Sequence, residues 1–429
     1  MWWLKARTME LFEDVRASYW FVPSLLAFLG FVAGLGLVYV DAIVGDDWLG
    51  RFSWFYGSRP EGARSLLSTV AGSTITVAGV VFSITLAAVT YASGQYGPRL
   101  LSNFVRDRGN QVTLGVFIGT FLYCLIVLRT IRSAAETSAD TGGAVREAFV
   151  PHIAMFGALA LAIASIGVLI YFVHHVTDAI HINNVIARIG RGLLADIAQR
   201  CDDDRAIHDV EDSLPLESLA AGAPVLALRT GYIKSFDEEA LLEIATERRA
   251  VITVLVSPGD FIHRGRPLLR VEPAPDDQLN ACGQLFSIGR QRSAQQDLRF
   301  PIDELVEIAA RALSPGINDP FTAIACIDWL GAALMDLSTV PMPPARLRDE
   351  DGQVRLNVPR LEFADYLQAA VGQLIPYAIK DPNAGAHLVR TLDAVFEAVA
   401  DSQHKRLIGA ERDNVACALT ISKGTESGE

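Results

Sequence analysis

The stretch STVAGSTITVAGVVFSITLAAVTYAS, residues 68–93, contains no charged side chain, and it lies within a longer uncharged run over residues 65–98. A helix needs about 20 apolar residues to cross a hydrocarbon core that is about 30 Å thick. The stretch is therefore long enough to span a membrane. It decides the fold class, because a chain with several such runs forms a membrane α-helical domain.

Three further runs have the same character. They cover residues 21–40, 109–128 and 148–177, and none contains Asp, Glu, Lys or Arg. The first run follows acidic residues and is not followed by a small-x-small cleavage pattern, so it is better explained as an uncleaved anchor helix than as a secretory signal. We predict four transmembrane helices within residues 1–180.

The charge distribution limits the possible partners. The chain has 49 acidic and 37 basic residues, and the excess of acid falls after the fourth run. An acidic soluble half is a poor partner for nucleic acid and, taken as a whole, is repelled by an anionic lipid leaflet. We therefore expect no nucleic-acid partner.

The positions of the basic residues and of the cysteines indicate the topology and the redox compartment. Four spans place both termini on one side, and this side carries slightly more Lys and Arg, so the N- and C-termini are expected in the cytoplasm. The five cysteines are scattered without CxxC spacing, which agrees with a reducing compartment and does not indicate a zinc site. They are Cys124, Cys201, Cys282, Cys326 and Cys417.

Small and hydroxyl-bearing residues recur along the second span. Ser68, Gly72, Thr76, Gly79 and Ser83 follow helical spacing, so they form one strip on the helix. Such a strip commonly packs closely against another helix. It could instead line a water-filled path, and we keep both interpretations open.

Two other spans carry GxxxG pairs, Gly30/Gly34 and Gly115/Gly119, which favour tight helix association within one chain or between copies. No Asp, Glu, Lys or Arg lies in the middle of any span. Ion-coupled carriers usually need such a group at membrane depth, whereas a passive pore does not.

A weak metal candidate lies at the end of the fourth span. His174, Asp178 and His181 occupy positions i, i+4 and i+7 and would share one face of a continuous helix. Two imidazoles and a carboxylate can bind a divalent metal or respond to pH, although a fourth ligand is not evident. The alternative is an ordinary interfacial helix.

The remaining chain is expected to form a soluble α+β domain. PGDFIHRGRPLLRV, residues 258–271, resembles the turn of lipoyl and biotinyl domains and predicts a small β-barrel or β-sandwich element. Lys234 precedes the predicted helix, so it does not suit a swinging arm. A Pro- and Arg-rich segment, residues 338–359, is expected to be a surface excursion. The predicted parts are a membrane domain (1–180), a helical extension and linker (181–225), a β-rich subdomain with an inserted helix (226–275), a helical subdomain containing a bundle (276–421) and a disordered tail (422–429).

ALSPGINDPFTA, residues 312–323, is interpreted as a turn between two helices. Pro315 ends the first helix, and Gly316 is expected to take positive φ. Asp319 is the expected N-cap of the second helix, with Pro320 at its first position. The alternative is an anion site at the helix N-terminus. The motif residues are Ser314, Pro315, Gly316, Asn318, Asp319 and Pro320.

This motif, the preceding IGRQRSAQQDLRFPIDELVEIAARAL and the membrane segment YASGQYGPRLLSNFVRDRGNQVTLGVFIGTFLYCLIVLR together resemble a bacterial family of predicted integral membrane proteins, the domain of unknown function 2254. The resemblance implies four membrane helices, a soluble C-terminal domain and a location in the bacterial inner membrane. It implies no activity, substrate or catalytic residue.

Two functions remain as hypotheses. The first is an oligomeric pore or transport-related protein with a cytoplasmic regulatory domain, which would be a homo-oligomer acting on a small ion. The second is a membrane-anchored sensor or scaffold whose acidic domain binds a protein partner or a metabolite. An enzyme is the least favoured class, because P-loop, GxSxG and HExxH motifs are missing from the sequence. We expect no catalytic residue and no cofactor.

Overall fold

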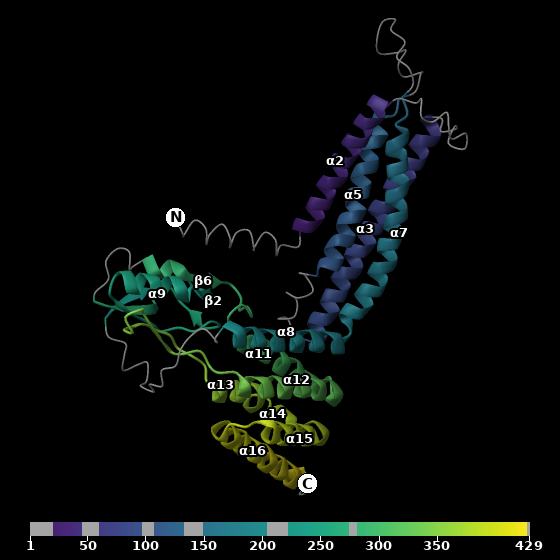
Figure 1. Ribbon diagram of the computed structural model, residues 1–429. Coiled ribbons are helices and arrows are strands. Elements are labelled where there is room, and N and C mark those ends of the chain that lie inside the picture. The colour runs from purple at the N-terminus through teal and green to yellow at the C-terminus, as the bar shows by residue number, and fades with distance from the viewer. Residues whose placement is uncertain are drawn as a thin grey trace, which may run out of the picture. The chain divides into compact units, whose positions relative to one another are not determined.

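The computed structural model describes residues 20–44, 60–96, 107–132, 149–203, 222–273 and 281–426. These residues belong to two compact units, residues 1–181 and 182–429 (Figure 1). Each unit is described by itself.

Unit 1 is a bundle of long helices. They are α2 (Phe21–Val44), α3 (Pro60–Tyr96), α5 (Arg108–Thr130) and α7 (His152–Ile180). Helix α5 is the most buried of these, and it contacts α2, α3 and α7. The side chains of Leu67, Tyr123 and Val127 are fully buried in the core between these helices. The predicted helical membrane domain is confirmed in its architecture.

The two GxxxG pairs hold α2 against α5. A Cβ atom on Gly30 would overlap the carbonyl oxygen of Gly119, and a Cβ on Gly119 would lie 2.8 Å from the carbonyl oxygen of Leu26. A Cβ on Gly34 would lie 3.2 Å from Ile126. These glycines let two backbones approach closely, as small residues do in membrane helices. The sequence allowed these pairs to associate within one chain or between copies. For both pairs, the structure shows association within one chain.

A side chain from another helix caps the start of α7. Asp41, near the end of α2, accepts hydrogen bonds from the backbone N–H groups of Ile153 and Ala154, both at 2.8 Å. Pro151 precedes α7 and offers no side-chain cap, so Asp41 satisfies donors that would otherwise be unpaired. Tyr123 donates to the carbonyl oxygen of Ala154 at 2.7 Å.

Length and composition identify five described helices that could cross a membrane, one more than predicted. Four of them are the helices of unit 1. The fifth is α12 (Pro320–Thr339), which lies in unit 2 and contacts α8, α11 and α15. Half of its apolar window is buried within the protein. Burial in a helical core explains the hydropathy of α12 as well as insertion into a membrane would. Composition alone does not distinguish these two explanations.

Unit 2 begins with α8 (Ile182–Asp203) and combines two sheets with a set of helices. The strands are β1 (Ala223–Leu226), β2 (Gly231–Phe236), β3 (Val251–Val254), β4 (Phe261–Ile262), β5 (Pro267–Glu272), β6 (Phe286–Gly289), β7 (Arg346–Arg348) and β8 (Val354–Asn357). Their order is β1-β5-β3-β8-β7 in one sheet and β4-β2-β6 in the other. Both sheets and α9 (Glu238–Glu247) contribute to one hydrophobic cluster, while the described strands do not close into a barrel.

The Pro- and Arg-rich segment is part of this sheet, so its interpretation as a surface excursion is wrong. Strands β7 and β8 form a hairpin within residues 338–359, and β8 pairs in parallel with β3. Leu356 lies opposite Ile252, and both side chains are fully buried. The prolines flank the strands, whereas Arg346 and Arg348 lie in β7 and Arg355 lies in β8. This composition concealed two short strands that bury Leu347 and Leu356.

The helices of unit 2 are α11 (Arg299–Ala312), α12, α13 (Phe363–Leu367), α14 (Ile375–Ala378), α15 (Pro382–Ala398) and α16 (Ser402–Glu426), with a short 3-10 helix (Ala281–Leu285) before β6 and a π-helical turn (Gln368–Gly372) after α13. Helix α12 packs against α8, α11 and α15. The side chain of Trp329 covers Gly190 of α8. Helix α16 continues to Glu426, so most of the tail predicted as disordered is helical, and residues 427–429 lie outside the described residues.

The glycine packing in unit 1 predicts opposite effects for two substitutions in one helix. Gly30→Ala should destabilise the protein by about 1–3 kcal/mol, because the added Cβ forces α2 away from α5. Gly36→Ala is the matched control, since the space beside Gly36 is open to 4 Å. The control should be neutral or slightly stabilising, because alanine favours a helix over glycine. Melting of the full-length protein in detergent checks this, and equal melting of both variants would contradict the packing.

Candidate functional site

The predicted strip on α3 lies on the outer side of the bundle. Ser68, Gly72, Thr76, Gly79 and Ser83 are all exposed in the protein chain. The buried residues of the same helix, such as Leu67, Ala71, Thr74, Ala78, Val81 and Thr85, occupy the opposite face. Within 4 Å of a Cβ placed on Gly72 or Gly79 there is no other atom. Unlike the glycines of α2 and α5, the α3 strip is not used in packing within unit 1.

Two hydroxyl groups of this strip donate hydrogen bonds to carbonyl oxygens of their own helix. Thr76 donates to the carbonyl oxygen of Gly72 at 2.8 Å, and Ser83 donates to that of Gly79 at 2.9 Å. Bonds of this type let Ser and Thr face an apolar environment, and each oxygen keeps lone pairs that can accept further hydrogen bonds. The strip can therefore face lipid, another helix or water.

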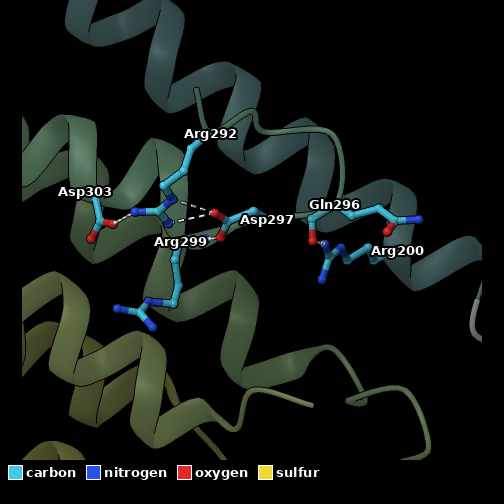
Figure 2. A network of polar contacts seen from close by, with 6 residues as sticks. All are labelled: Arg200, Arg292, Gln296, Asp297, Arg299 and Asp303. Carbon is cyan, nitrogen blue, oxygen red and sulfur yellow. Dashed lines mark hydrogen bonds and ion pairs between the residues drawn. The ribbon is translucent and has the colours of Figure 1, made fainter. Parts of the chain in front are cut away.

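A second candidate lies in unit 2, where a loop between β6 and α11 carries a buried ionic cluster (Figure 2). We call this the polar hub, defined by Arg200, Arg292, Gln296, Asp297 and Asp303. The Arg292 guanidinium donates to Asp297 Oδ2 at 2.6 and 3.0 Å and to Asp303 Oδ2 at 2.6 Å. The Asp297 side chain is only 1% exposed. Arg292 thus neutralises two carboxylates, one from the loop and one from α11.

The environment shifts the acid–base properties of the hub. Burial opposes the charge on Arg292, but the hydrogen bonds and charges of Asp297 and Asp303 outweigh burial and raise the arginine pKa. Burial raises the pKa of Asp297, and the hydrogen bonds and charge of Arg292 oppose this rise. Burial also raises the pKa of Tyr366 in α13, and the positive charge of Arg200 opposes this rise. Arg292 is therefore permanently cationic, and the hub depends on it.

The hub connects segments that are distant in the sequence. The Gln296 side chain exchanges two hydrogen bonds with the backbone of Phe236 at the end of β2, at 3.0 and 3.1 Å. Arg200 of α8 donates to the carbonyl oxygen of Gln296 at 2.6 Å. Gly259, in the turn after β3, has φ of 92° and lies so close to Asp297 that a Cβ would overlap the carboxylate. The hub thereby ties α8 and the helices to both sheets.

Some polar atoms of the hub region are buried without a protein hydrogen-bond partner. They are Ser293 Oγ, Arg299 Nε and Asp303 Oδ1. Groups of this kind usually bind internal water, since leaving them unsatisfied costs about 1–3 kcal/mol each. The arrangement can therefore hold water or a small polar ligand, but nucleophile and general base are not paired in it as they are in a catalytic site.

The 312–323 motif is a turn, as interpreted, with one difference. The Asp319 side chain accepts from the backbone N–H and the hydroxyl of Thr322, at 3.2 and 2.6 Å, and Pro320 is the first residue of α12. The positive φ expected at Gly316 is wrong, because Asn318 takes it instead, with φ of 50°. Asparagine tolerates this region because its short polar side chain can bond locally. Ser314 supplies the carbonyl oxygen that accepts from Ile317 and Asn318, and Pro315 follows the last turn of α11.

The metal candidates are only partly brought together. His174 and Asp178 lie 3.4 Å apart on α7, and the His174 side chain is 83% exposed. His181 follows the end of α7 and is exposed. A search of the described residues finds no group of three or more His, Cys, Asp and Glu side chains that could hold a metal ion. The metal hypothesis for these three residues stays an untested prediction.

Sequence reasoning missed three polar interactions. His175, next to the residue that was singled out, binds both carboxylate oxygens of Asp107 at 2.8 and 3.0 Å. Asp107 also caps α5. The Asp41 cap and the Arg292 hub were missed as well. Asp107 stands before a helix start and could have been identified as a cap. The His175 and Asp41 contacts join residues far apart in the chain, whereas the carboxylates that Arg292 binds are only 5 and 11 residues away and have no recognisable spacing.

A bundle of apolar helices followed by an α+β unit defines the class of the protein, a multi-pass membrane protein with a large C-terminal region of sheets and helices. A family model described as "Predicted membrane protein (DUF2254)" matches residues 16–394, and the chain belongs to this family. Relatives from Mycobacterium bovis and Mycobacterium tuberculosis, both described as uncharacterized proteins, are 32% identical over 409 residues. The alignments cover 93% of this chain and 75% of theirs. The search of solved structures gave no match.

The polar hub predicts a large loss of stability when its arginine is removed. Arg292→Ala should destabilise unit 2 by about 3–5 kcal/mol, because two carboxylates then remain in a buried site without their cation. Arg412→Ala is the control, since its partners Asp393 and Asp413 are largely exposed and such pairs contribute little to stability. Hydrogen exchange of residues 286–312 in the full-length protein measures the difference. Similar exchange in both variants would show that the hub is not a stabilising centre.

The turn motif predicts a smaller effect. Asp319→Ala should destabilise the start of α12 by about 1 kcal/mol, because the cap for the N–H of Thr322 is lost. Asp319→Ser keeps an acceptor at the same position and should retain most of the stability. Thermal melting of the two variants is the measurement, and equal melting temperatures would exclude capping as the role of this residue.

Proposed function

We propose that the protein forms a homo-oligomeric passive pore for a small ion, in which the α3 strips of several copies surround a solvated axis and unit 2 regulates the opening. The proposal places the protein in the bacterial inner membrane with both termini in the cytoplasm. It is carried by one observation: the strip of Ser68, Gly72, Thr76, Gly79 and Ser83 points away from the core of its own bundle.

The contrast between the glycines supports assembly through α3. Gly30 and Gly119 are in contact within the chain, while the space next to Gly72 and Gly79 is open. A second helix can approach closely only where side chains are small. Gly36 of α2 and Gly167 of α7 also lie beside open space, but on α3 two such glycines share one strip with Ser68, Thr76 and Ser83. Of these three outer faces, that of α3 is best suited to meet another copy.

The chemistry of the strip suits passive conduction. The hydroxyl oxygens of Thr76 and Ser83 can accept hydrogen bonds from water or contact a cation, as pore linings do. Within the described parts of the unit 1 helices, the most deeply buried carboxylate is Asp41, and it is used as a cap for α7. Coupling to a proton gradient normally needs an ionisable group at membrane depth, so passive conduction is the simpler mechanism.

Regulation would act through α8. This helix begins at Ile182, directly after His181, and its residue Arg200 is bonded to the polar hub. A ligand or partner that changed the packing around the hub would act on α8, which continues the chain of the membrane helix α7. The hub supplies a physical connection for such coupling.

The second candidate is a membrane-anchored scaffold. It is favoured by the hydrogen bonds that Thr76 and Ser83 make to their own helix, because these hydroxyls then need no water. In this case the α3 strips of two copies pack together in a dry interface and unit 2 binds a partner.

Thiol accessibility along α3 separates the two functions. Thr76→Cys and Ser83→Cys lie on the strip, and Ile84→Cys is the control on an exposed flank of the same helix. Thiol reagents react with the thiolate, which forms in water and not in lipid. We expect a charged methanethiosulfonate reagent to modify the two strip positions about tenfold faster than position 84. Equal protection of all three positions would instead support the scaffold.

Conductance completes the test. The reagent adds a charge at position 76, so it should change the currents of the reconstituted Thr76→Cys protein and leave those of Ile84→Cys unaffected. Currents that are identical before and after modification at position 76 would contradict a pore lined by α3.

A further inference from the structure

Two turns of unit 2 lie side by side and form one surface. The first joins β1 to β2 and, taken with the last residue of β1, covers residues 226–230. The second joins β4 to β5 and, taken with β4, covers residues 261–266. Ala227 donates its N–H to the carbonyl oxygen of Arg266 at 2.8 Å, and Gly265 donates to that of Ala227 at 2.9 Å. The N–H of Arg264 binds Thr230 Oγ1 at 3.0 Å. We name these two turns the basic-apolar tip.

Large apolar side chains project from the tip into solvent. Leu228 is 70% exposed, Phe261 is 54% exposed and Leu226 is 46% exposed. The Phe261 ring lies edge-on to Tyr232, with ring centroids 5.1 Å apart. Isolated exposed apolar residues are common, but three on two adjacent turns form a patch of the kind that marks a binding surface.

The charges around this patch have one sign. Residues 222–236 and 261–271 contain no Asp or Glu, although the chain as a whole has a net charge of −12. Arg229, His263, Arg264 and Arg266 belong to the tip, and none of the ion pairs between described residues involves any of these arginines. The carboxylate next to the tip, Asp260, accepts the backbone N–H of Ser257. The tip is therefore locally basic on an acidic unit.

Arg266 donates to the carbonyl oxygen of Phe261 at 3.0 Å, and the tip arginines form no ion pair among the described residues. Apolar side chains beside such arginines match the chemistry of an anionic membrane surface. The apolar groups enter the boundary between headgroups and acyl chains, and the arginines meet lipid phosphates. Unit 2 is also covalently attached to the membrane helices, because α8 starts two residues after α7 ends. An acidic patch on a second copy would satisfy the arginines but not the apolar side chains.

We propose that the basic-apolar tip docks on the anionic surface of the membrane that holds unit 1. The proposal is independent of whether α3 lines a pore. The total charge predicts that unit 2 as a whole is repelled by an anionic leaflet. The proposal differs for the tip, because the acidic residues that would repel a lipid leaflet lie elsewhere in unit 2.

The test uses the full-length protein reconstituted in vesicles of phosphatidylcholine, with or without phosphatidylglycerol. Leu228→Cys carries an environment-sensitive fluorophore in a background of Cys201→Ser and Cys417→Ser, while Cys124, Cys282 and Cys326 are buried. Lipids bearing a nitroxide quench the fluorophore if it enters the headgroup region. Gln353→Cys, an exposed position in the turn between β7 and β8, is the control site. Both leaflets have the same composition, so the orientation of the protein does not affect the result.

We expect strong quenching at position 228 in vesicles that contain phosphatidylglycerol, weak quenching in phosphatidylcholine alone and weak quenching at position 353 in both. Arg264→Glu should lower the docking equilibrium at position 228 by about fivefold or more. Arg406→Glu, the same charge reversal on exposed α16, should not change it.

Two results would overturn the proposal. One is equal quenching at positions 228 and 353 in both kinds of vesicle. The other is protection of position 228 from aqueous quenchers without lipid quenching, in both lipid compositions, which would identify a second copy of the chain as the occupant.

Discussion

The close approach of α2 and α5 is the constraint on which the membrane unit depends. Because Gly30 and Gly119 bring two backbones into contact, α5 can lie in the middle of the bundle and still contact α3 and α7. Lipid tails are as apolar as leucine, so helices in a membrane associate through close packing and not through exclusion of water. The glycines of α2 and α5 are used in this contact, whereas Gly72 and Gly79 of α3 lie on the exposed side of the bundle.

Unit 2 depends on a different interaction. Arg292 holds Asp297 and Asp303 in a buried site, and the loop that carries them also binds the end of β2 through Gln296. Charges of this kind are stable in the interior only when each finds a partner. The hub therefore connects β2, α8 and α11, and this connection is the basis of the regulatory role that we propose for the unit.

Much of the fold could be predicted because its signals are local. Four long apolar runs gave the four helices of unit 1, and the order of residues around Asp319 and Pro320 gave the helix-turn-helix connection. The prediction failed where a local signal was weak or ambiguous. Strands β7 and β8 have only three or four residues each and are recognisable as strands only through their pairing with each other and with β3. Asn318, and not Gly316, takes the positive φ, because the geometry of the whole turn selects the residue.

The sequence by itself determined that the protein is a multi-pass membrane protein with an acidic α+β unit, since hydrophobic length and charge are properties of the chain. Only the tertiary structure decided which small residues are buried, which arginine binds which carboxylates and where exposed apolar side chains gather. Gly30 and Gly72 are both glycines in apolar helices, yet one is in contact and the other faces open space. Packing partners and local charge arise from residues that are far apart in the sequence, so they are defined only when the chain has folded.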